Sequence, residues 1–199
     1  MPTYKLTYFN FKGRAELIRY IFAYKNTEYE DVRIEFSEWP ALKPSIVYGQ
    51  LPILEIDGVV YHQSIAIARY LAKQAGLVGK TDLDNLRIDA LIDSFDDFIS
   101  AFPWSEPDEA KKKQKQEEYI KNGSPTLLAA LEKSLGDKTW FAGDYVTWAD
   151  FYWDTFSDGL EAFDPNFAKN LPNLQALKKR VQSIPSIASW LERRPKTEH

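Results

Sequence analysis

The pattern of hydrophobic residues changes near Gly76, and this change leaves few architectures open to the chain. Before Gly76, segments that alternate β-branched and aromatic residues lie between segments with helical spacing. After it, apolar residues recur every three or four positions, which is typical of helices alone. The 199 residues are enough for two small domains, each with its own core. The sequence therefore predicts an α/β domain over 1–75, a linker over 76–82 and an all-helical domain over 83–199.

Within the first segment the predicted order is strand, helix, strand, hairpin and helix. The clearest signal is Asp57-Gly58 between two apolar runs, because this dipeptide suits a two-residue type I′ turn. The predicted elements are strands over 4–9, 29–34, 53–56 and 59–61, helices over 14–24 and 65–73, and a short irregular helix over 39–43. Ser64 is expected to cap the helix over 65–73, and Gly76 to end it.

The second segment predicts a series of amphipathic helices. They cover 85–102, 109–135, 172–182 and 185–193, and the last two each have a proline near the first turn. A further aromatic helix follows Thr147, which is spaced from Asp150 as in a capping box.

Composition excludes several classes of function. The chain has no cysteine and only two histidines, so a thiolate-ligated zinc, a redox thiol or a Ser-His-Asp triad is not expected. The net charge is −4, and the lysine run over 111–115 is flanked by glutamates, which favours a solvated helix face over nucleic-acid binding. Neither a signal peptide nor a membrane span is recognisable, so we expect a cytoplasmic protein that binds no membrane.

Three features of the first segment point to one binding site. Pro52 follows a tight loop and is a candidate for a cis peptide bond that turns the Leu51 backbone outward to pair with an extended peptide. Gln63-Ser64 stands at a helix N-terminus, where free amides and a hydroxyl bind carboxylates. Tyr8 ends the first strand, where its phenol can donate into a cleft. The alternatives are an ordinary trans proline, a serine that only caps its helix and a tyrosine of the core.

In this order and spacing, these features and their neighbours resemble the sigma-class glutathione transferases, which include the haematopoietic-type prostaglandin D synthases. The resemblance covers essentially the whole chain and is carried by YKLTYF over 4–9, GRAE over 13–16, GQLPILE over 49–55, QSIAIARYL over 63–71 and TWADFY over 147–152. It implies an α/β thioredoxin-like N-terminal domain that binds glutathione, an all-α C-terminal domain that binds the electrophile, and a homodimer.

The resemblance also assigns roles to residues. Tyr8 would hydrogen-bond the glutathione sulfur and hold it as thiolate, and Arg14 would add positive potential beside that hydroxyl. Other positions would bind the tripeptide: Trp39 and Lys43 its glycine end, Gln50, the Leu51 backbone and cis Pro52 its middle, Gln63 and Ser64 its γ-glutamyl carboxylate, and Asp97 of the partner subunit its amine.

For the electrophile pocket the resemblance points to residues of both predicted domains. Its walls would be Phe9, Gly13, Arg14, Ile99, Trp104, Tyr152, Phe156 and His199. Trp104 alternatively only packs the helical bundle. Phe156 and His199 depart from what vertebrate prostaglandin synthases lead us to expect, because one is bulky and the other is polar.

A metal site is a separate hypothesis. Asp93, Asp96 and Asp97 lie near one helix face, and across a two-fold axis they could supply oxygen ligands for Mg²⁺ or Ca²⁺, as in prostaglandin-synthase-like members of the family. A solvated acidic face is the alternative.

The leading functional hypothesis is therefore an enzyme that ionises glutathione for attack on small hydrophobic electrophiles, such as lipid-oxidation aldehydes. One alternative is a glutathione-dependent isomerase that converts prostaglandin H to prostaglandin D. Another is a non-enzymatic crystallin-like or ligand-carrying protein, against which the complete set of glutathione residues argues. A peroxidase side activity is open, because a bound thiolate can attack hydroperoxides.

Overall fold

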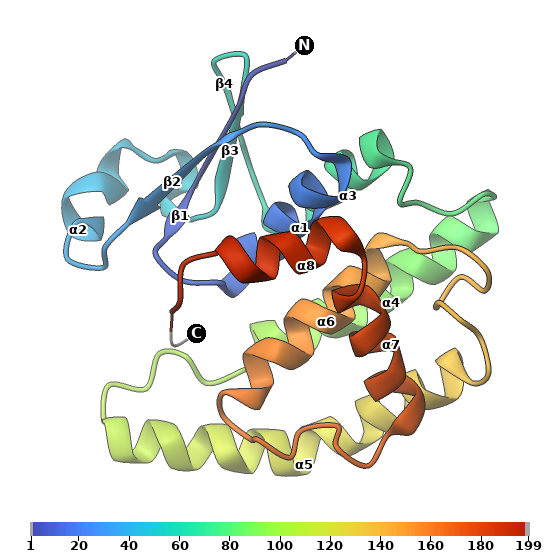
Figure 1. Ribbon diagram of the computed structural model, residues 1–199. Coiled ribbons are helices and arrows are strands. Elements are labelled where there is room, and N and C mark those ends of the chain that lie inside the picture. Colours follow the sequence, from blue (N-terminus) through green and yellow to red (C-terminus); the bar gives the residue numbers. More distant parts are fainter. Residues whose placement is uncertain (1, 198–199) are drawn as a thin grey trace. The chain divides into compact units, whose positions relative to one another are not determined.

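The first strand of the chain is at the centre of a four-stranded mixed sheet. The computed structural model describes residues 2–197. The sheet order is β2-β1-β3-β4, with β1 parallel to β2 and antiparallel to β3, and with β3 antiparallel to β4 (Figure 1). The strands are β1 (Tyr4–Phe9), β2 (Glu30–Ile34), β3 (Ile53–Ile56) and β4 (Val59–His62).

The helices that accompany the sheet are α1 (Glu16–Lys25), α2 (Trp39–Leu42) and α3 (Ser64–Ala75). A 3-10 turn over Gly13–Ala15 leads into α1, so the helix begins two residues later than the sequence predicts. Helices α1 and α3 pack on each other, and their apolar faces are buried together with those of β1 and β3. Buried residues of this core include Leu6, Ile18, Leu54, Leu71 and Ala72.

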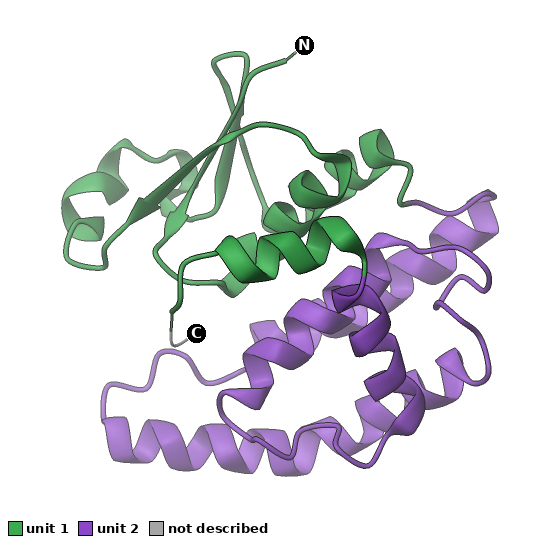
Figure 2. Ribbon diagram, viewed as in Figure 1, with its two compact units in different colours: residues 1–77, 184–199 green, residues 78–183 purple. Residues whose placement is uncertain are grey.

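The chain divides into two compact units. The first consists of residues 1–77 and 184–199, and the second of residues 78–183 (Figure 2). Helix α8 (Pro185–Arg193), which the sequence places in the helical segment, belongs to the first unit because it packs along α1 (Figure 1).

The second unit is helical. It contains α4 (Asp82–Ser100), α5 (Glu109–Leu135), α6 (Trp148–Glu161) and α7 (Pro172–Gln182). Its core is aromatic: the Phe95 ring lies 5.1 Å from that of Phe156 and 5.2 Å from that of Tyr152, and Trp153 is fully buried. The predicted bounds of α5, α7 and α8 agree with the structure.

The capping box predicted at the start of α6 is confirmed. The Asp150 Oδ2 atom accepts hydrogen bonds from the Thr147 backbone N–H at 2.7 Å and from the Thr147 hydroxyl at 3.2 Å. Its other oxygen accepts from the Phe141 N–H at 2.9 Å. Asp150 is fully buried, and this burial outweighs the hydrogen bonds and raises the pKa of its carboxyl from 3.8 to about 6.

Two predicted helix starts need correction. Ser64 does not cap α3: it is the first residue of the helix, and the preceding Gln63 is the N-cap, in a conformation with positive φ. Helix α4 begins three residues earlier than predicted, because Thr81 and Asp84 form a second capping box. Among residues 2–197, no helix has the length and apolar character needed to cross a membrane.

The raised pKa of Asp150 gives a pH-dependent contribution to stability. A carboxyl that binds its proton more tightly when folded stabilises the native state below pH 3.8, and this contribution is lost as the pH rises through about 6. Lowering the pH from 7 to 4.5 should therefore stabilise the protein by about 2 kcal/mol more than it stabilises Asp150→Asn. Urea unfolding of both proteins at both pH values measures this difference. An equal response of the two proteins would show that Asp150 ionises normally.

Candidate functional site

The sheet register aligns three of the residues predicted for the site. Thr7 pairs with Ile53, and Ile53 pairs with His62. Continued by one residue, the same register places Tyr8, Pro52 and Gln63 in one row across the sheet. The Leu51–Pro52 peptide bond is cis, as the sequence suggested, and Pro52 is buried.

The Tyr8 hydroxyl is the buried polar group at the end of this row. Tyr8 is 6% exposed, and its oxygen accepts a hydrogen bond from the Arg14 backbone N–H at 3.2 Å. Burial raises the pKa of the Tyr8 phenol, against smaller opposing effects of that N–H and of the Arg14 and Arg19 charges. The phenol therefore stays protonated at neutral pH and can donate a hydrogen bond to an anion.

Gly13 allows the turn after β1 to approach this hydroxyl closely. Its φ is +43°, and a Cβ atom built on it would lie 2.6 Å from the Tyr8 hydroxyl oxygen and 2.5 Å from Phe11 Cε2. Only glycine fits this position without moving one of the two rings.

Four further predicted residues lie in the segment between β2 and β3. Trp39 begins α2, and its ring meets that of Phe9 edge-on, with the centroids 5.5 Å apart. Lys43 follows that helix, and its Cε atom is 3.3 Å from the position of a Cβ on Gly49. The Lys43 side chain therefore lies over Gly49, the residue that precedes Gln50 in the chain.

The start of α3 combines backbone strain with buried polarity. Gln63 has φ 73° and ψ 101°, a conformation that non-glycine residues rarely adopt. Ser64, the next residue, is buried. The first amides of a twelve-residue helix thus lie at the row of Tyr8 and Pro52, where the helix dipole favours a carboxylate.

The predicted pocket residues of the second unit fall into two environments. Trp104 is 48% exposed and is held by a hydrogen bond from its indole N–H to the Ile99 carbonyl at 3.0 Å. Tyr152 and Phe156 are buried in the aromatic core, and the Tyr152 hydroxyl lies 3.5 Å from Asp96 Oδ1. His199 lies outside the described residues.

The three candidate metal ligands lie on α4. Asp93 and Asp97 are exposed and Asp96 is half-buried. Within the described part of one chain, no group of three or more carboxylates or histidines is placed to hold a metal ion. The predicted ion therefore needs ligands from a second copy of the chain.

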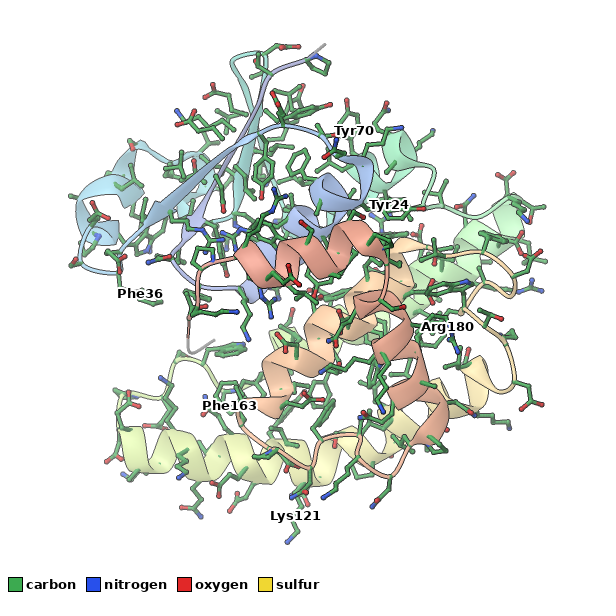
Figure 3. The ribbon with its side chains drawn as sticks, viewed as in Figure 1. Tyr24, Phe36, Tyr70, Lys121, Phe163 and Arg180 are labelled. Carbon is green, nitrogen blue, oxygen red and sulfur yellow. The ribbon has the colours of Figure 1, made fainter. Side chains whose placement is uncertain are left out.

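Sequence reasoning missed an aromatic cluster beside Tyr8. The rings of Phe9, Phe11 and Phe36 are nearly parallel, with centroids 4.6–5.7 Å apart, and the Phe11 ring lies 5.2 Å from that of Tyr8. Phe36 is 65% exposed (Figure 3). The alternation of Phe9 and Phe11 hinted at a shared face, but no local signal placed Phe36 with them.

It also missed a charged pair that is buried on α1. Glu16 and Arg19 have fractional exposures of 2% and 0%. Their spacing of three residues indicated an ion pair within the helix, but not the partners from the end of the chain that complete it.

The close approach at Gly13 predicts a specific loss of stability. Gly13→Ala should lower the free energy of unfolding by about 2–3 kcal/mol, from overpacking added to left-handed strain. Gly58→Ala is the matched control, because Gly58 also has positive φ but open space around it, and it should cost only about 1 kcal/mol. Urea unfolding measures both. Equal losses would mean that Tyr8 and Phe11 yield freely to the extra methyl group.

Comparison with known proteins agrees with this geometry. The family model described as "Glutathione S-transferase, N-terminal domain" matches residues 4–73, and that described as "Glutathione S-transferase, C-terminal domain" matches residues 93–194. The hematopoietic prostaglandin D synthase of Gallus gallus is 50% identical over 99% of both chains, and that of Homo sapiens is 49% identical over 100% of both. The solved structure of the rat synthase with a quinoline has a TM-score of 0.96 at 48% identity, over 99% of this chain and 100% of that one.

The two family models together span most of the chain, and the relatives match it from end to end, so this protein belongs to the glutathione S-transferase family.

Proposed function

We propose that this transferase ionises glutathione against the Tyr8 hydroxyl and directs the thiolate at small hydrophobic electrophiles. The observation that supports this most directly is the state of Tyr8. The phenol is buried and protonated, and the Arg14 N–H already occupies an acceptor position of its oxygen. Such a group acts as a hydrogen-bond donor, which is what a sulfur anion beside it requires.

The energies required are modest. A free thiol has a pKa of about 8.5, so only a few per cent is ionised at pH 7. Each unit by which the thiol pKa falls needs about 1.4 kcal/mol of preferential stabilisation of the anion. A charge-assisted hydrogen bond from Tyr8 and the positive potential of Arg14 together supply about two units. The protein itself needs no cysteine, because the substrate brings the sulfur.

The remaining roles are those that the family resemblance implies. Gln63 and Ser64, at the N-terminus of α3, would bind the γ-glutamyl carboxylate, and the Leu51 backbone would pair with the middle of the tripeptide. Trp39 and Lys43 would hold the glycine end, with Gln50 beside them. Asp97 of the partner subunit would reach the γ-glutamyl amine.

The aromatic cluster supports a hydrophobic co-substrate. Phe9, Phe11 and Phe36 present apolar ring surface that begins next to the Tyr8 ring and ends at an exposed side chain. Trp104, which is 48% exposed and anchored to the Ile99 carbonyl, presents a flat apolar ring on the second unit. An α,β-unsaturated aldehyde fits this chemistry: the sulfur bonds to the β-carbon, the alkene electron pair moves toward the carbonyl oxygen, and the α-carbon takes up a proton.

A homodimer in the cytoplasm is part of the proposal. The β3–β4 hairpin and the preceding loop expose Tyr48, Val59, Val60 and Tyr61, and Tyr48 is 71% exposed. A second copy of the chain would bury this apolar surface and bring Asp97 to the site. The cytosol keeps glutathione reduced, and a chain without cysteines forms no disulfides that would need an oxidising compartment. The divalent ion at the dimer axis remains a prediction.

Removing the Tyr8 hydroxyl should separate binding from chemistry. Tyr8→Phe is expected to bind glutathione with near-normal affinity while turnover with an alkenal at pH 7 falls about ten- to hundredfold, because the thiol pKa rises toward its free value of about 8.5 and the hydrogen bond to the sulfur is lost. Calorimetry measures the affinity, and the ultraviolet absorbance of the thiolate measures the pKa. Tyr24→Phe on α1 serves as the control. Unchanged turnover in Tyr8→Phe would remove Tyr8 from the mechanism.

Isomerisation of prostaglandin H to prostaglandin D is the second candidate, favoured by about 50% identity to proteins named for that synthesis. The thiolate would bond to one endoperoxide oxygen as the O–O bond breaks, and the other oxygen would take up a proton. The ring carbon then loses a proton, its ketone forms, and the S–O bond breaks to release the thiolate.

Product analysis of prostaglandin H incubated with protein and glutathione tests the isomerase. We expect prostaglandin D above the amount in a control without protein if the pocket fixes the endoperoxide in one orientation. A product mixture identical to the control would leave a general conjugating transferase.

A further inference from the structure

A buried carboxylate on α1 joins the end of the chain to the first helix. One oxygen of Glu16, Oε1, accepts hydrogen bonds from Trp190 Nε1 and from Arg194 Nη1, both at 2.9 Å. The other, Oε2, accepts from Arg19 Nη1 at 3.3 Å. Three side chains therefore donate hydrogen bonds to one carboxylate. Two of them, Trp190 and Arg194, lie on or just after α8.

Arg19 carries this connection to the turn beside Tyr8. The same Nη1 atom donates to the Phe11 carbonyl at 2.9 Å and to the Lys12 carbonyl at 3.4 Å. These two residues directly precede Gly13 and Arg14, and the Arg14 N–H donates to the Tyr8 oxygen. An unbroken path of contacts thus runs from Arg194 through Glu16 and Arg19 to the hydroxyl at the candidate site.

Further ion pairs hold Arg19 in place along this path. Arg19 Nε also donates to Asp31 Oδ1 at 3.2 Å, and Asp31 Oδ2 accepts from Arg33 Nε at 2.8 Å. Carboxylates at Glu16 and Asp31 and guanidinium groups at Arg19, Arg33 and Arg194 thus form one connected cluster, in which Arg194 and Arg19 bind the same carboxylate.

We propose that Arg194 is a positioning residue for thiol ionisation. It acts through Glu16 and Arg19 to fix the turn that supports Tyr8. This inference rests on the proposed function, since it presupposes that glutathione ionises against Tyr8. Arg194 would thus influence the chemistry at Tyr8, although the two residues are far apart in the sequence.

The test is a pH titration of bound glutathione in Arg194→Gln, followed by thiolate absorbance and by kcat/KM with an alkenal. We expect the thiol pKa to rise by about half a unit, so that kcat/KM falls about threefold below this pKa and recovers at higher pH. Lys196→Gln, an exposed position with the same change of charge, should behave as the wild type. Arg194→Lys should restore part of the shift, because the charge is kept.

The outcomes separate this inference from the function on which it rests. A wild-type protein that shows no thiolate with bound glutathione overturns both. A wild type that ionises glutathione and an Arg194→Gln variant with the same pH profile overturn this inference alone, as does a loss that is equal at every pH. If Arg194→Gln fails to fold, Trp190→Phe removes the other donor from the end of the chain and is expected to shift the profile in the same direction.

Discussion

The central position of β1 is the constraint on which the site depends. This strand hydrogen-bonds to β2 on one edge and to β3 on the other, so its register is fixed twice. A slip of one residue would turn Tyr8 to the opposite face of the sheet. The position of the hydroxyl is thus set by the backbone ladder, and the turn at Gly13 needs only to close over it.

A buried neutral phenol can stabilise an anion at a lower desolvation cost than a buried cation. A buried ammonium or guanidinium group would have to be stripped of water, at a cost of several kcal/mol, before any substrate arrived. The Tyr8 phenol avoids this cost because its raised pKa keeps it uncharged. The low polarity that raises this pKa would also strengthen the hydrogen bond from the phenol to the proposed thiolate.

The sequence predicts elements well where the signal is local. Helices α7 and α8 begin at prolines and their bounds agree with the structure, and those of α5 agree although Pro125 lies inside that helix. The start of α4 is predicted too late because its first turn is mostly polar and its one apolar residue, Leu83, is exposed. The positive φ of Gln63 has no signal in a single sequence, since glycine or asparagine would be expected there.

Contacts between distant parts of the chain could not be predicted at all. Glu16 and Trp190 are 174 positions apart, and each looks ordinary in its own helix: one begins an amphipathic turn and the other lies on an apolar face. The aromatic cluster also joins distant residues. Phe36 follows β2, which ends at Ile34, and it meets Phe9 because β1 pairs in parallel with β2. The residues proposed to bind glutathione could be named from the sequence because they lie in short motifs, whereas the groups that hold those motifs in place are scattered.

The Glu16 network is more easily understood as a device for geometry than for stability. Buried ion pairs are often no more stabilising than well-packed apolar residues of the same volume, because desolvation offsets their attraction. The pair of Lys178 and Glu161 in the second unit involves only two side chains and keeps a partly exposed carboxylate. The carboxylate of Glu16 is instead fully enclosed, and the guanidinium that binds it also holds the two carbonyls before Gly13. An apolar replacement could fill the same space but could not hold those carbonyls, and with them the turn whose amide reaches Tyr8.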